Sequence, residues 1–120
     1  MRKLVLAVLL AASFTGIYAQ KLDDVKDKVG KQKWDEAKEK IDKVMTDEKA
    51  QNNSEAWFYK AKIYQNLAKA HPEDSMLMPQ AFDAMKTYLK LEEKQPENKR
   101  FLVSTIEGNK TVFDFYSESF

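Results

Sequence analysis

The chain of 120 residues contains no cysteine, which excludes disulfide bonds, cysteine metal sites and a lipid-modified N-terminal cysteine. Glycine and proline are also scarce, with 3 of each, too few for a loop-rich all-β fold. Alanine, lysine, glutamate, leucine and methionine are frequent, and all five favour helix. Composition therefore predicts a helical protein that is held together by packing alone.

Histidine is nearly absent as well, and this narrows the possible chemistry. His71 is the only histidine, in the loop sequence "AHPED", so no histidine-pair metal site or Ser–His–Asp triad can form within the chain. No glycine-rich phosphate loop occurs. We expect the acidic pairs on solvated helix faces rather than in an acid/base site; they are Asp23–Asp24, Asp35–Glu36 and Glu92–Glu93. The sequence predicts no enzyme, no cofactor and no metal.

No excess of charge of either sign is present. Lys and Arg number 20 and Asp and Glu 19, and the two signs are interspersed along the chain. Because no cationic face suited to a phosphate backbone emerges, we expect no binding to nucleic acid.

The first nineteen residues have the layout of a secretory signal peptide. Arg2 and Lys3 precede an apolar run, and Ala19 stands at a plausible cleavage position before Gln20. The uncharged run ends at residue 19 and is shorter than the about 20 residues that a spanning helix needs. An uncleaved anchor is the alternative. We expect an exported protein with no integral membrane span after cleavage, in the periplasm or at the outer membrane of a Gram-negative bacterium.

Apolar residues at helical spacing predict helices over residues 21–30, 33–46, 55–70 and 78–94. Gly30 is expected to stop the first helix, and Asn53 or Ser54 to cap the third. Pro79 fits only in the first turn of the fourth. The residues 47–54 read as a polar connection. The predicted fold is all-α, made of antiparallel helical hairpins.

The spacing of small and aromatic residues resembles the tetratricopeptide repeat (TPR). Trp57 is followed by Ala61 and Tyr64 on one helix, and Ala84 precedes Tyr88 on the next. The resemblance implies hairpins stacked as a right-handed α-solenoid. After the signal peptide, residues 1–19, the resemblance divides the chain into three segments. These are a partial first hairpin, 20–50, a hairpin with an extended inter-helix loop, 51–96, and the truncated start of a further repeat, 97–120.

The same resemblance assigns a packing role to a set of small and aromatic side chains. Small residues let two helix backbones approach closely, and aromatic residues fill the space between hairpins. The predicted packing residues are Trp34, Ala37, Trp57, Ala61, Tyr64, Ala84, Tyr88 and Pro96.

A binding face is predicted on the opposite side of the helix 55–70. Family position and a helical wheel both select Glu55, Phe58, Tyr59, Lys62, Gln65 and Asn66. TPR proteins bind peptides or proteins along such a concave face, so the resemblance implies a scaffold with a protein or peptide partner. For Phe58 and Tyr59, packing against the neighbouring helix A of an adjacent repeat is the alternative. A second functional hypothesis is a docking module of a longer exported enzyme whose catalytic domain follows residue 120.

The C-terminal sequence "KTVFDFYSESF" predicts one more apolar helix face. Its members are Val112, Phe113, Tyr116 and Phe120, and no polar capping helix follows them. We expect this face to be covered by further chain or by self-association.

Overall fold

The computed structural model describes residues 20–96 and 105–119. These residues form helices and their connections, without a strand among them, which confirms the all-α prediction. The helices are residues 20–30, α2 (Trp34–Val44), α3 (Glu48–Gln51), α4 (Ser54–Ala70), α5 (Leu77–Glu93) and α6 (Thr105–Glu118). Residues 1–19 and the remainder of 97–120 lie outside this description, and with them the predicted signal peptide and Phe120.

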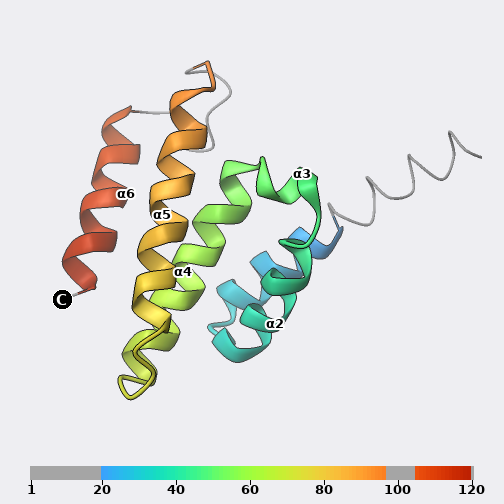
Figure 1. The fold of residues 1–120 in the computed structure, drawn as a ribbon, viewed down its shortest axis with the longest axis vertical. Helices are drawn as coiled ribbons and strands as arrows, with labels where there is room; N and C mark the ends of the chain where they lie inside the picture. The colour runs from blue at the N-terminus through green and yellow to red at the C-terminus, as the bar shows by residue number, and fades with distance from the viewer. Residues whose placement is uncertain (1–19, 97–104, 120) are drawn as a thin grey trace, which may run out of the picture.

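Helices α4 and α5 form the central antiparallel hairpin (Figure 1). Helix α6 lies beside α5 on one side of this hairpin, and α2 packs against α4 on the other. The connection between α4 and α5 is short, residues 71–76, because both helices extend to 17 residues. The expected long loop is therefore replaced by longer helices.

The start of α4 is set by a side-chain cap, as the sequence predicts. Asn53 Oδ1 accepts hydrogen bonds from the backbone N–H of Glu55 at 2.9 Å and of Ala56 at 3.4 Å. Such a cap typically contributes about 1 kcal/mol. Pro79 lies in the first turn of α5, also as predicted.

The connection 47–54 is not wholly irregular, contrary to expectation. It contains the short helix α3, whose N-cap Asp47 accepts the N–H of Lys49 at 2.8 Å. Ala50 is fully buried in this turn. Because Ala50 is the only apolar residue in this polar stretch, no hydrophobic periodicity indicated a helix there.

The turn before α2 differs from the glycine stop that we expected at Gly30. Gly30 is the last residue of the first helix and does not have a positive φ, whereas Gln32 does, at 56°. Lys33 N–H donates to the carbonyl of Lys28 at 2.9 Å, and Gln32 N–H to that of Val29 at 3.0 Å. This pair of bonds is a Schellman motif, in which a non-glycine residue occupies the left-handed position.

The core runs through the α2–α4–α5 stack. Ala37, Ala61 and Ala84 are buried where helices meet, as their predicted packing role requires. The larger fully buried side chains include Val25, Ile41, Val44, Ile63 and Met85. Each such aliphatic side chain contributes roughly 1.5–3 kcal/mol when it leaves water.

Candidate functional site

Helix α4 contacts α2 through Tyr64, one of the predicted packing residues. The Tyr64 hydroxyl donates to Asp42 Oδ1 of α2 at 2.6 Å, and Lys38 Nζ donates to Asp42 Oδ2 at 2.9 Å. The ring of Tyr64 is 4% exposed. Burial, together with the hydrogen bond and the charge of Asp42, raises the pKa of Tyr64. Aromatic burial and a charge-assisted hydrogen bond thus join α2 to α4.

Of the other predicted packing residues, Trp34 and Trp57 pack against the core while partly exposed, and Pro96 does not pack. Trp34 and Trp57 are half-buried, and the indole N–H of Trp57 donates to the carbonyl of Gln51 at 2.8 Å. Lys60 Nζ lies 5.2 Å from the centre of the Trp57 ring. Pro96 is exposed beyond the end of α5, so a packing role for it is wrong.

The opposite side of α4 begins with an ion pair to the first helix. Lys26 Nζ lies 2.5 Å from Glu55 Oε1. The hydrogen bond to Glu55 raises the pKa of Lys26, against a smaller opposing effect of burial. Tyr59 is half-buried beside this pair, and burial raises the pKa of its hydroxyl. Glu55 and Tyr59 are therefore partly exposed.

Phe58 packs within the hairpin. Its ring centre lies 5.5 Å from that of Tyr88 on α5 and 5.7 Å from that of Tyr59. Tyr88 is buried, which raises the pKa of its hydroxyl to about 12, with a smaller contribution from Glu92. Phe58 is thus a packing residue, but its partner is α5 of its own hairpin and not helix A of an adjacent repeat.

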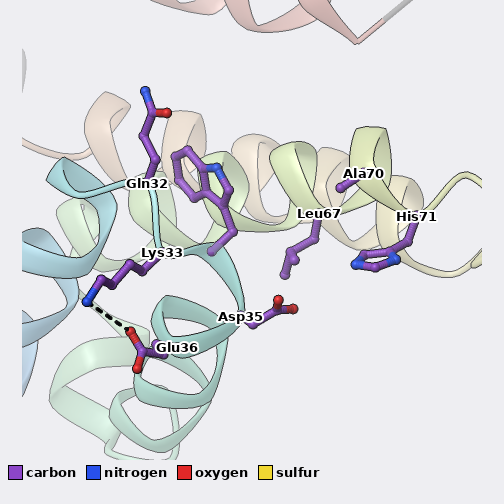
Figure 2. A pocket seen from close by; sticks show the side chains of 8 residues that line it. Gln32, Lys33, Asp35, Glu36, Leu67, Ala70 and His71 are labelled. Carbon is purple, nitrogen blue, oxygen red and sulfur yellow. Dashed lines mark ion pairs between the residues drawn. The ribbon is translucent and has the colours of Figure 1, made fainter.

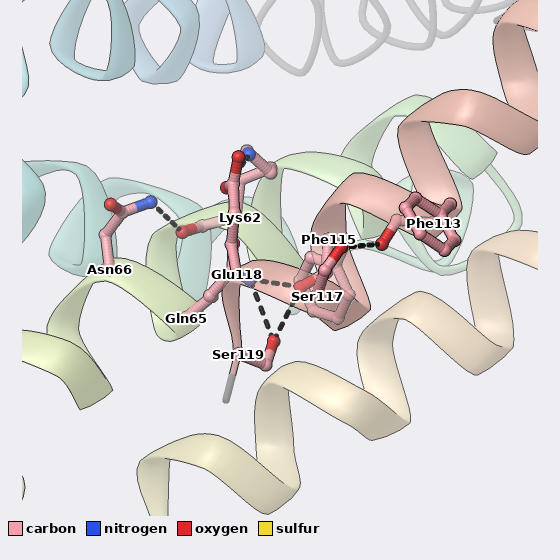
Figure 3. A network of polar contacts seen from close by, with 8 residues as sticks. All are labelled: Lys62, Gln65, Asn66, Phe113, Phe115, Ser117, Glu118 and Ser119. Carbon is pink, nitrogen blue, oxygen red and sulfur yellow. Dashed lines mark hydrogen bonds and ion pairs between the residues drawn. The ribbon is translucent and has the colours of Figure 1, made fainter.

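The predicted binding face is covered by α6 at its far end (Figure 3). Gln65 is fully buried, and its Nε2 donates to the carbonyl of Phe115 at 2.6 Å and to Ser119 Oγ at 2.8 Å. Lys62 Nζ lies 3.9 Å from Glu118 Oε2. Asn66 donates to the carbonyl of Lys62 at 2.8 Å. The expectation that Gln65 is accessible to a partner is therefore wrong for this arrangement.

Helix α6 packs through Phe115, a residue that the predicted C-terminal face did not include. Phe115 is 1% exposed and lies edge-on to Phe82 of α5, with 6.2 Å between ring centres. Val112 and Tyr116 are half-buried against the core, but Phe113 is 71% exposed. A wheel drawn through residues 112, 115, 116 and 119 would have found the packed side, because these positions follow helical spacing.

A shallow pocket of about 260 Å³ opens between the start of α2 and the end of α4 (Figure 2). Its lining residues are Gln32, Lys33, Trp34, Asp35, Glu36, Leu67, Ala70 and His71. His71 is exposed and lies 3.2 Å from Glu73 Oε1. The volume lies below the roughly 300–1,000 Å³ typical of small-molecule sites.

Glu92 is buried, so its expected place on a solvated helix face is wrong. Ser54 Oγ donates to Glu92 Oε1 at 2.6 Å, which ties the start of α4 to the end of α5. A carboxylate near a helix N-terminus is also favoured by the helix dipole. This hydrogen bond holds the two helices of the hairpin together.

The residues that the structure describes contain no group of three or more His, Cys, Asp or Glu side chains that could hold a metal ion. Among the same residues, no helix is both long and apolar enough to cross a membrane. In comparisons with known proteins, no family model, curated protein or solved structure matched the chain.

Proposed function

We propose that this chain is a non-enzymatic protein-interaction scaffold of the cell envelope, built as a TPR-type α-solenoid. In this proposal the helix 20–30, α4 and α6 are the inner helices of successive hairpins, and α2 and α5 are the outer ones. Two ion pairs support this order, because Glu55 of α4 meets Lys26 of the first helix and Lys62 of α4 meets Glu118 of α6. Each pair joins one inner helix to the next.

The observation that carries the proposal is the strip Glu55, Phe58, Tyr59 and Lys62 on α4. All four side chains are half-buried, so part of each reaches solvent. Aromatic groups that combine an apolar ring with a polar tip are enriched at protein interfaces. Flanking charges of both signs favour a partner segment with complementary charges.

The strip can be tested by partner recovery from an envelope extract. The double substitution Tyr59→Ala and Lys62→Ala changes the strip, and Lys86→Ala with Lys90→Ala changes two exposed residues of α5 as a matched control. We expect the first variant to lose a partner that the wild type and the control retain. Equal recovery by all three proteins, with equal helicity by circular dichroism, would remove the strip as the binding surface.

Export is part of the proposal and rests on the layout of residues 1–19. Intact-mass measurement of the protein isolated from its native cells tests it separately. We expect a chain that begins at Gln20. A mass that includes Met1, found in the cytoplasmic fraction, would contradict export and leave the binding strip open.

A further inference from the structure

We propose that the surface on which α6 rests, which shares Lys62 with the strip, extends the proposed binding face, and that its ligand is an amphipathic helix of the α6 type. We define the α6 seat as Lys62 and Gln65 of α4 together with Phe82 of α5. The inference rests on the proposed scaffold function and names the partner class. Helix α6, which takes the inner position of the next hairpin in the proposed scaffold, then fills the site from within the chain as an internal copy of the ligand.

The contacts that α6 makes with the seat indicate which side chains a ligand needs. Phe115 fills the apolar part, where it lies edge-on to Phe82. Gln65 Nε2 donates to the carbonyl of Phe115 and to Ser119 Oγ, four positions later (Figure 3). Glu118 lies opposite Lys62. A fitting helix therefore carries a buried aromatic residue, a carboxylate three positions on and a polar side chain four positions on.

The attachment of α6 is light compared with that of the other long helices. Of the α6 side chains that the structure describes, Phe115 alone is buried, whereas α4 buries residues along its whole length. A helix of 14 residues is marginal by itself in water. Regions with few buried apolar contacts open at lower free energy than the core does. Among the described side chains, the seat is thus held to α6 by fewer fully buried groups than join α4 to the core.

An unsatisfied polar atom shows that α6 is an imperfect occupant. Gln65 Oε1 is buried and has no hydrogen-bond partner among the described residues. Ser119 cannot supply one, because its hydroxyl already donates to the carbonyl of Phe115 at 2.7 Å. A buried acceptor without a donor weakens the docked state relative to the open, hydrated one. A helix that placed an amide at the position of Ser119 could accept from Nε2 and donate to Oε1.

A labelled peptide of residues 105–119 tests the proposal on the full chain. Val112→Pro breaks α6 without changing the seat, and Phe115→Ala removes its anchor. We expect the peptide to raise its fluorescence anisotropy with either variant, at a dissociation constant about tenfold or more below that for wild type, whose own helix competes. No binding to either variant, while both retain the helicity of α4 and α5, would overturn the proposal.

Three control measurements make the result specific to the seat. A peptide with Phe115→Ala should not bind, and a Val112→Pro chain that also carries Phe82→Ala should lose the wild-type peptide. A peptide with Ser119→Asn should bind more tightly than the wild-type peptide, and equal affinity would overturn the role assigned to Gln65 Oε1. Peptide failure combined with loss of the natural partner from the Tyr59/Lys62 variant would reject the seat and retain the scaffold function.

Discussion

On one side of α4, Tyr64 meets α2; on the other, Lys62 and Gln65 meet α6. The first side combines the fully buried Ala61, the buried ring of Tyr64 and its hydrogen bond to Asp42 at 2.6 Å. The second combines a partly exposed ion pair with a buried amide whose oxygen is unsatisfied. The same helix thus has one side fixed by packing and one side closed by a contact that a better partner could replace.

This difference gives α4 one side that stabilises the fold and one side suited to the binding role proposed above. Close packing is energetically sensitive to each methylene group, so it favours a single arrangement. A surface that is held by few buried groups opens at lower free energy and is therefore suited to exchange. The two roles alternate around α4 because neighbouring residues along a helix point in different directions.

The largest effect is expected from breaking the α2 side. Ile41 of α2 is fully buried, and Ile41→Ala should lower the free energy of unfolding by about 2–5 kcal/mol. Urea unfolding followed by circular dichroism measures it, with Lys43→Ala on the same helix as an exposed control that changes by at most about 0.5 kcal/mol.

The contrasting substitution is Phe115→Ala on α6, which deletes a larger buried side chain. We expect the main cooperative transition to shift by less than about 1 kcal/mol, because α6 detaches before the α2–α4–α5 stack unfolds. A shift as large as that of Ile41→Ala would make the two sides of α4 equivalent and would break the comparison.

Alkaline pH should weaken the packed hairpin through Tyr88. Its pKa is raised to about 12 by burial, whereas an unfolded tyrosine titrates near its ordinary value of 10. The stabilising contribution is therefore complete below pH 10 and is lost as pH rises toward 12. At pH 11 the loss amounts to about 1 kcal/mol. Urea unfolding at pH 8 and pH 11 should show a smaller pH effect in Tyr88→Phe than in wild type; identical pH effects would assign the loss to other groups.

The turn before α2 offers a substitution that should stabilise the protein. Gln32 has a φ of 56°, a conformation that glycine adopts without a steric penalty. Gln32→Gly should raise the free energy of unfolding by about 1 kcal/mol. Lys31→Gly, one residue earlier at an exposed position without positive φ, should not raise it. Thermal unfolding of both variants measures these effects. A lower midpoint for Gln32→Gly than for wild type would contradict a left-handed Gln32 in solution.

The smallest effect is expected at the ion pair between Lys62 and Glu118. Their nitrogen and oxygen lie 3.9 Å apart, and both side chains reach solvent. Glu118→Gln should cost at most about 0.5 kcal/mol at low salt and nothing measurable at about 1 M salt. A salt-independent loss would show that Glu118 acts through packing rather than through its charge.

Periodicity was sufficient to predict the long helices, the cap at Asn53 and the buried alanines, because these depend on local spacing. It could not predict which side of α4 is covered, since the cover comes from Phe115 and Ser119, some fifty residues later. Glu92 was misassigned for the same reason, as its partner Ser54 is distant in sequence. Local spacing does not show whether a polar side chain is buried, or which of two possible apolar sides of a helix is covered. Contacts with residues distant in sequence determine both.

The central claim is that α6 opens separately from the α2–α4–α5 stack. Native-state hydrogen exchange, followed by mass spectrometry of peptides from α4, α5 and α6, measures this most directly. We predict that α6 amides exchange through a local opening well below the global unfolding free energy, and that Phe115→Ala accelerates α6 alone. If α6 instead exchanged at the same opening free energy as α4, in wild type and in Phe115→Ala alike, the account would be contradicted.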